Sequence, residues 1–276
     1  QLKLQPLPSS RAGNSRTQSS RFARRHAATI QVVAVLLVAM SSASLAAAAT
    51  LSYGNRAASP LMFENIEETA DDAPLFGPPR GAGPLLNFDP KSFTASAADG
   101  SETTLGTLTF DVGDGPTPDL YGFRKFEITE FGDYTLFNTT AAATAASNVQ
   151  AATKVGVTVS EVNGNAVTPF TVSASTLLVK EMPTDKAFLQ AWNLQLTVDL
   201  SGDLALHGYG PGAAITGASV ELSNELSAAS EPGVTAYIAK KDLIVTFTPE
   251  LSVPEPSTLC GAIAFGVLVA GGRRRD

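Results

Sequence analysis

The sequence predicts an all-β body, an antiparallel β-sandwich or a jelly-roll-like fold, between an N-terminal signal helix and a short C-terminal transmembrane helix. Three observations predict the fold of the body. Apolar and polar residues alternate in several short segments, as in strands with one buried face. Glycine and asparagine turns separate these segments. No segment of helical length carries a sustained apolar stripe, so the crossover helices of a parallel sheet are not expected.

The clearest strands fall in residues 103–252, which we expect to form the β-sandwich. The alternating segments are LTFDV (108–112), KVGVTVSEV (154–162) and WNLQLTVDL (192–200). Asn163 and Gly164 tolerate positive φ and predict a hairpin into AVTPFTV (166–172). A last hairpin is expected where KKD (240–242) joins VTAYIA to LIVTFT. The alanine-rich residues 141–153 fit either a helix or a surface loop.

Residues 49–102 form a Pro/Gly-rich N-terminal part of the body. Their clearest break is FGPPRGAGP at residues 76–84, because proline and glycine interrupt regular structure. We expect this part to be extended or to form sheet edges. Leu85, Leu86 and Phe88 are the side chains available to cover a sheet face.

The body is strongly acidic, which limits its partners. Residues 47–252 contain 10 Lys and Arg against 24 Asp and Glu, a net charge of −14. Such a surface repels phosphate backbones, so we expect no nucleic-acid binding.

Residues 1–48 have the order of a leader and a secretory signal peptide. A basic cluster (RFARR, 21–25) is followed by an apolar stretch and then by small residues. The basic segment stays cytoplasmic and the small side chains suit signal peptidase, so we expect cleavage after one of residues 46–49. An uncleaved N-terminal anchor is the alternative.

Few residues in the body could perform catalysis, and we expect none to be catalytic. His207 is its only histidine, and Cys260 lies in the C-terminal tail. A Ser-His-acid triad would have to use His207, without a G-x-S-x-G elbow, and a multi-histidine or Cys-based metal site is excluded by counting. Paired carboxylates of a glycoside hydrolase stay open, with Glu127 and Glu130 or Asp199 and Asp203 as candidates. Glu127 and Glu130 differ in parity and should point to opposite faces of a strand.

Other polar features have simpler explanations. DVGDG (111–115) and DLSGD (199–203) depart from the spacing of regular calcium loops, so we expect turn acids and no cofactor, with weak Ca²⁺ binding as the alternative. Trp192 is expected in the core and not as a sugar-stacking platform. Asn138 begins the only N-x-[ST] sequon and is a candidate glycosylation site.

The C-terminal 24 residues, 253–276, have three parts in a fixed order. VPEPST is extended by its two prolines, and residues 259–272 follow without a charge. As a helix these 14 residues span about 21 Å, short for ~30 Å of hydrocarbon, so insertion would be temporary. Positive residues next to a span stay cytoplasmic, so the three arginines should stop transfer. The motif is Val253, Pro254, Glu255, Pro256, Ser257 and Thr258, and the stop-transfer residues are Arg273, Arg274 and Arg275.

This order resembles the PEP-CTERM sorting signal of exosortase substrates from Gram-negative-type bacteria. Pro254, Glu255 and Pro256 match its motif, and the arginines match its basic end. The acidic Asp276 and the apolar-segment Cys260 depart from the pattern. The resemblance implies recognition by exosortase, a membrane cysteine transpeptidase, cleavage near Pro-Glu-Pro, and delivery through an inner-membrane intermediate to the cell surface or extracellular matrix. A plain C-terminal membrane anchor is the alternative.

These observations predict an exported surface or matrix protein with a non-catalytic structural or adhesive β-domain. Its expected partners are signal peptidase, exosortase, and the membrane through residues 259–272 before processing. A second hypothesis is a carbohydrate-binding module for extracellular polysaccharide. A third hypothesis is the carboxylate-dependent glycoside hydrolase.

Overall fold

A computed structural model describes residues 49–70, 73–116, 119–138, 144 and 146–252 of the chain. These residues form an all-β, jelly-roll-like domain with one short helix. Its elements are β1 (Ala49–Ala58), β2 (Leu61–Ala70), β3 (Leu85–Phe88), β4 (Thr94–Ala97), β5 (Gly100–Asp114), β6 (Tyr121–Asn138), β7 (Asn148–Val162), β8 (Asn165–Glu181), β9 (Ala187–Asp199), α2 (Ser201–Leu206), β10 (Ile215–Ser230) and β11 (Val234–Leu251).

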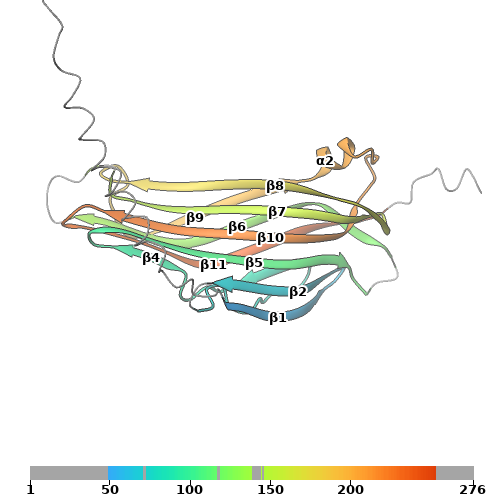
Figure 1. Cartoon of the computed structure of the whole chain (residues 1–276), viewed down its shortest axis with the longest axis horizontal. Helices are drawn as coiled ribbons and strands as arrows, with labels where there is room; N and C mark the ends of the chain where they lie inside the picture. Colours follow the sequence, from blue (N-terminus) through green and yellow to red (C-terminus); the bar gives the residue numbers. More distant parts are fainter. Residues whose placement is uncertain (1–48, 71–72, 117–118, 139–143, 145, 253–276) are drawn as a thin grey trace, which may run out of the picture. The chain divides into compact units, whose positions relative to one another are not determined.

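The strands form one antiparallel sheet that is folded into two layers (Figure 1). The front layer has the order β1-β2-β5-β10-β7-β8. In the back layer β11 pairs with β3, β4 and β6, and β6 pairs with β9. The layers are joined through β10 and β6, where Ile215 pairs with Phe123. The short strands β3 and β4 of the proline-rich segment lie at the edge of β11, so residues 49–102 contribute to both layers.

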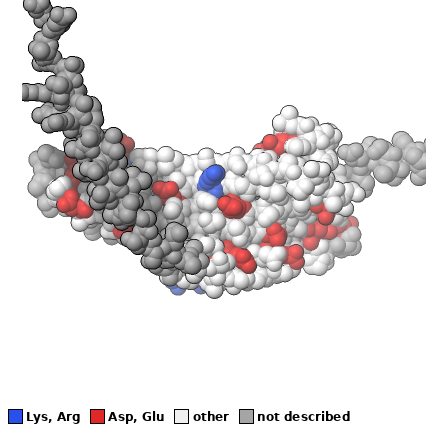
Figure 2. Space-filling view, in the orientation of Figure 1, with Lys and Arg blue, Asp and Glu red and all other residues white. Residues whose placement is uncertain are grey.

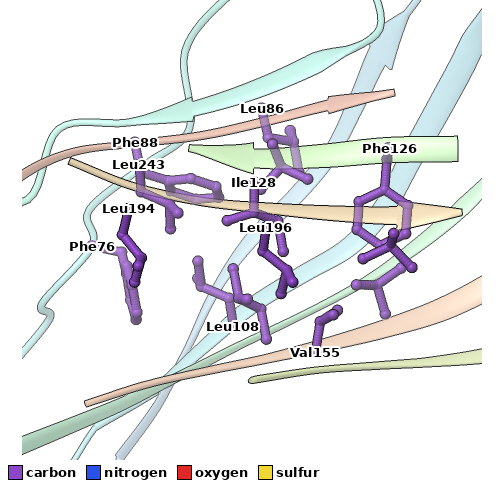
Figure 3. Close-up of a cluster of buried hydrophobic side chains, with 14 of the residues drawn as sticks. Phe76, Leu86, Phe88, Leu108, Phe126, Ile128, Val155, Leu194, Leu196 and Leu243 are labelled. Carbon is purple, nitrogen blue, oxygen red and sulfur yellow. The ribbon is translucent and has the colours of Figure 1, made fainter. Parts of the chain in front are cut away.

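Apolar side chains from both layers fill the space between them. Phe126 and Phe247 stack with ring centroids 4.8 Å apart, and Phe123 contacts Phe247 edge to face at 4.9 Å. Rings in such pairs add stabilisation beyond the area that they bury. Figure 3 shows Leu108 and Val155 of the front layer facing a group of back-layer side chains. The result is one continuous core.

The predicted alternation is confirmed in three strands. The inward side chains are buried while their neighbours face solvent, because successive residues of a strand point to opposite faces. The buried sets are Leu108, Phe110 and Val112 in β5, Val155, Val157 and Val159 in β7, and Leu194, Leu196 and Val198 in β9.

The hairpin predicted between β7 and β8 is also confirmed. Val162 pairs with Asn165 across a two-residue turn. Asn163 has φ 51° and Gly164 has φ 74°, the positive values that such a turn requires.

The hairpin predicted at KKD is wrong. β11 runs unbroken from Val234 to Leu251, and its pairing with β6 shifts by one residue between Lys240 and Asp242. This shift is a β-bulge, which changes which residues face inward. Lys240 is buried in phase with Ala236 and Ile238, Lys241 is exposed, and after the bulge Leu243 is the next residue that faces inward. Charged residues suggested a turn, but one of the lysines has partners inside the core.

Residues 148–153 belong to β7, so the helix or loop predicted over 141–153 is wrong for that part. Of the earlier part, residues 139–143 and 145 lie outside the described residues. The described helix is α2, directly after β9, and it was not predicted. No helix in the described ranges is long and apolar enough to cross a bilayer. The expected signal helix and C-terminal transmembrane helix fall in 1–48 and 253–276, where the structure gives no description.

Gly132 is predicted to be essential for the packing of the back layer. A Cβ atom there would lie 1.8 Å from the Ala239 carbonyl oxygen and 2.8 Å from the Trp192 ring. Overpacking of this kind costs about 1–3 kcal/mol, so Gly132→Ala should lower the free energy of unfolding by at least that amount. Denaturant titration measures the change, and Gly202→Ala in α2 is the control, because a Cβ there meets open space. Equal stability of the two variants would contradict this packing.

Candidate functional site

A groove crosses the outer face of the front layer, over four neighbouring strands. It has a volume of about 300 Å³. Its lining side chains are short and mostly hydroxylic, and they come from alternate positions that point away from the core: Thr109, Lys154, Gly156, Thr158, Thr171, Ser173, Ser219, Glu221 and Ser223. The groove therefore rests on the middle of a paired sheet and not on loops.

Gly156 of β7 forms the floor of this groove. It lies in one cross-strand row with Glu221 of β10 and Ser173 of β8. A Cβ atom at residue 156 would have no atom within 4 Å, so the space above its backbone is open. Glycine inside a strand weakens the strand and often marks a place where a ligand approaches the backbone closely.

The groove offers hydrogen-bonding groups of several kinds. The hydroxyls of Thr158 and Thr171 lie 2.9 Å apart across β7 and β8. Lys154 and Glu221, at diagonal positions on β7 and β10, add a positive and a negative group. The lining contains no aromatic ring. Figure 2 shows the face of the front layer as mostly uncharged, with scattered acidic groups and few basic ones.

An apolar hollow continues the groove toward the other end of the same strands. Its volume is about 450 Å³, and it shares Lys154 and Ser223 with the groove. Leu105 and Leu177 are each more than half exposed, and Glu225 and Ala152 lie between them in one cross-strand row. Together the two parts form an extended depression with a hydroxylic half and an apolar half.

Directly beneath these strands, the core contains a cluster of four polar side chains. The Lys240 Nζ lies 2.7 Å from the Glu130 Oε2, and these two side chains are 0% and 1% exposed. The Lys240 ammonium also donates a hydrogen bond to the Oδ1 of Asn224. Thr153 Oγ1 donates to Glu130 Oε1 at 2.6 Å and accepts from Asn224 Nδ2 at 3.4 Å. Lys240 and Glu130 belong to the back layer, whereas Asn224 and Thr153 belong to the front layer, so the cluster bridges the two.

Two aromatic rings cover the Lys240 amine. The Nζ atom lies 4.9 Å from the Phe93 ring centroid and 5.9 Å from that of Phe76. Burial lowers the pKa of Lys240, and the nearby Glu130 carboxylate opposes this shift without overcoming it. The amine is thus displaced toward its neutral form.

A second buried carboxylate fixes the segment that carries Phe76. Glu68 is 1% exposed, and its oxygens accept hydrogen bonds from the backbone N–H groups of Leu75, Phe76 and Gly77. The Tyr53 hydroxyl donates to Glu68 Oε2 at 2.5 Å. Burial, together with this carboxylate, raises the pKa of Tyr53. Glu68 therefore holds the loop after β2 against the core.

Of the paired carboxylates considered from sequence, Glu127 and Glu130 do not come together. Glu127 and Glu130 point to opposite faces, as predicted. Glu127 accepts a hydrogen bond from Gln195 at 2.6 Å on the outer surface, while Glu130 is buried. Asp199 Oδ1 accepts from the Ser201 backbone N–H at 3.0 Å. Hydrogen bonding from the Ser201 side chain, and then from its backbone N–H, lowers the pKa of Asp199.

The acids of the first calcium-like turn, DVGDG, also have protein partners. Asp111 Oδ2 accepts from Asn65 Nδ2 at 2.8 Å, and Asp114 Oδ1 accepts from the Tyr121 backbone N–H at 3.1 Å. Among the described residues, no three His, Cys, Asp or Glu side chains gather in a way that could hold a metal ion.

The remaining candidates take structural positions. His207 stacks on Phe170 with ring centroids 3.9 Å apart. Trp192 lies in the core, as predicted, and its Nε1 donates to the carbonyl oxygens of Asp133 and Ala239. Asn138 is buried and accepts from Lys186 Nζ at 2.7 Å, an arrangement that a glycan would disrupt. The sorting motif 253–258 and Arg273–Arg275 lie beyond the described part of the chain.

No family model and no curated protein sequence matches this chain. Two solved structures show a low similarity. A loop-swap mutant of Xyn11A from Necallimastix patriciarum has a TM-score of 0.22 and 10% identity, covering 73% of this chain and all of that one. The T13 viral particle of IBDV has a TM-score of 0.10 and 11% identity, covering 75% of this chain and 56% of that one. Similarities of this size carry no functional argument.

Sequence reasoning missed both the groove and the buried cluster. The sequence contains a local signal for the cluster. Thr153, Asn224 and Glu130 each occupy a strand position at which the alternation predicts an apolar residue. The groove left only Gly156, a glycine in the middle of a valine-rich strand. Neither signal shows by itself which strands become neighbours.

Replacing the Glu68 carboxylate should destabilise the domain. In Glu68→Gln one oxygen becomes an N–H₂ donor that faces other donors, so buried hydrogen bonds are lost. We expect a loss of about 2–4 kcal/mol in the free energy of unfolding, measured by denaturant titration. Glu67→Gln is the matched control, because Glu67 points to the outer face and should change stability by less than ~0.5 kcal/mol. Equal losses in both variants would contradict the role of Glu68.

Proposed function

We propose that the β-body is a non-catalytic adhesive or structural domain that works outside the cell and binds an uncharged polysaccharide in the groove above Gly156. The observation that carries this proposal is the row of hydroxyl groups over four paired strands, open above a glycine floor. Sugar chains present many hydroxyls, which serine and threonine can bind as donors and as acceptors. The length of the depression suits a polymer better than a single small molecule.

Charge favours a neutral polymer over an acidic one. The body carries a net charge of −14 between residues 47 and 252, which repels polyanions. Lys154 and Glu221 in the groove can each form a charge-assisted hydrogen bond with a sugar hydroxyl. The apolar half, between Leu105 and Leu177, suits the less polar faces of sugar rings.

The spacing of the acids in the depression supports binding without cleavage. Glycoside hydrolysis generally needs two carboxyl groups about 5 to 10 Å apart. Glu221 and Glu225 point to the same face of β10, and their four-residue separation corresponds to ~13 Å along a strand. The Cα atoms of the two acids are thus farther apart than a catalytic pair of carboxyl groups, so the strand does not itself hold them at a catalytic separation.

We also propose that the chain reaches its site through the C-terminal signal. The support is the order of Pro254-Glu255-Pro256, an uncharged segment and three arginines. β11 ends at Leu251, so the motif follows the last strand directly. An enzyme that recognises the motif, such as exosortase, would act on residues that begin two positions after the end of β11.

Filling the groove should weaken binding without unfolding the domain. Gly156→Val places a β-branched side chain in open space, where it suits a strand and blocks the groove floor. We expect the affinity for extracted matrix polysaccharide to fall by about tenfold or more, or ~1.4 kcal/mol, in calorimetric titration.

Gly113→Val on β5 is the control for this substitution. It lies on the same outer face, outside the groove, and should keep the affinity of the unmodified chain. A chelator in a parallel titration tests the Ca²⁺ alternative. Binding that survives Gly156→Val, or no binding to any matrix polysaccharide, would refute the groove as the site.

The sorting proposal predicts that Pro254→Ala with Pro256→Ala leaves the tail uncut. The double variant should remain in the membrane fraction with a higher mass than the processed chain, as detected by immunoblotting of cell fractions. Pro249→Ala, inside β11, is the control and should be processed normally. Unchanged size and location of the double variant would remove the support for this route.

A further inference from the structure

The buried cluster of Lys240, Glu130, Asn224 and Thr153 contains the groups needed for a covalent reaction within the chain. We propose that Lys240 and Asn224 form an intramolecular isopeptide bond without an enzyme, tying β11 to β10 with the release of one ammonia. This inference does not depend on the polysaccharide site or on the route of sorting.

The first support is the placement of the two reacting groups. The Lys240 Nζ lies within hydrogen-bonding distance of the Asn224 Oδ1, so the side-chain carbonyl carbon is next to the amine. Both residues point inward from strands in different layers and are held by full-length pairing on β11 and β10. Holding reactants at this separation removes most of the entropic cost of a bimolecular step.

The second support is Glu130, which is positioned to move protons. Its Oε2 lies 2.7 Å from Nζ. Its Oε1 accepts from Thr153 Oγ1, which in turn accepts from Asn224 Nδ2, the nitrogen that must leave. The carboxyl group is thus connected to both the attacking and the leaving nitrogen.

The third support is the apolar surroundings. Phe76 and Phe93 are fully buried and cover the amine, so bulk water does not reach it. Both members of this ion pair lose their hydration inside the apolar core, which favours transfer of the proton from Lys240 to Glu130. The lowered pKa of Lys240 has the same cause and direction. A neutral amine is the nucleophile that the reaction requires.

The reaction balances without any additional reactant. The ammonium of Lys240 gives one proton to the Glu130 carboxylate. The free Nζ then attacks the Asn224 side-chain carbon, and a C–N bond forms. Glu130 donates its proton to the amide nitrogen and accepts one from the new bond's nitrogen, so the old C–N bond breaks and ammonia leaves. The products are a secondary amide, a protonated Glu130 and ammonia, with no oxidation or reduction.

Digestion of the full-length chain tests the bond. A glutamyl endopeptidase cleaves the denatured protein after Glu221 and Glu225. Asn224 then lies in the peptide of residues 222–225, and Lys240 lies in a different peptide. We expect mass spectrometry to find the two peptides joined and lighter by one ammonia than their sum. Separate peptides with their full masses would overturn the proposal. The peptide masses from the unsubstituted chain test the proposed bond directly, so the test does not depend on whether any variant folds.

Variants assign the roles of the residues. Lys240→Arg should leave the peptides separate because it removes the attacking amine. Asn224→Ala should do the same because it removes the side-chain carbonyl that the amine attacks. Lys241→Arg, at the exposed neighbouring lysine, should keep the linked peptide. Glu130→Gln, with folding checked by circular dichroism, should also remain unlinked. A linked peptide in Asn224→Ala would refute this residue as the acceptor, and one in folded Glu130→Gln would refute the proton transfer.

Discussion

The amine of Lys240 is the constraint around which the centre of this domain is organised. Burying a charge costs several kcal/mol unless it is paired and hydrogen-bonded. Here the partners come from both layers: Glu130 from β6 and Asn224 from β10 contact the amine, and Thr153 from β7 hydrogen-bonds to both of these partners. Glu68 holds the loop that places Phe76 over the amine. Changing the relative position of the two layers would break these contacts together.

Two strands, β7 and β10, contribute to both the buried cluster and the surface groove. Thr153 and Asn224 pair across β7 and β10 and point inward. The next residue on β7, Lys154, and the preceding residue on β10, Ser223, also pair, and they point outward into the groove. Because alternate side chains share one backbone, a rigid cluster below fixes the hydroxyl groups above. A binding surface on such strands needs little ordering when a ligand arrives.

The sequence supported the prediction of individual strands better than the prediction of the bulge in β11 or of the polar cluster between the two layers. The alternation in β5, β7 and β9 is a local signal that was sufficient to predict these strands. The Asn163-Gly164 turn was likewise sufficient to predict the hairpin between β7 and β8. The prediction for KKD failed because buried partners hold Lys240 inside the core, and a β-bulge in the pairing with β6 lets the strand continue through the charged residues. Lys240, Glu130 and Asn224 come from segments far apart in the chain. Only the folded topology brings them together, so no local pattern could predict the cluster.

The place of β11 at the end of the domain has a mechanical consequence. If residues 253–276 hold the protein at a membrane, tension on the tail enters the domain through β11, which ends at Leu251. With Lys240 bonded to Asn224, unravelling from that end would stop at residue 240. The strand beyond it could be pulled out, but the two layers would remain joined. Under tension, a surface protein built in this way would extend by the length of the segment beyond residue 240, and the rest of the domain would then stay folded.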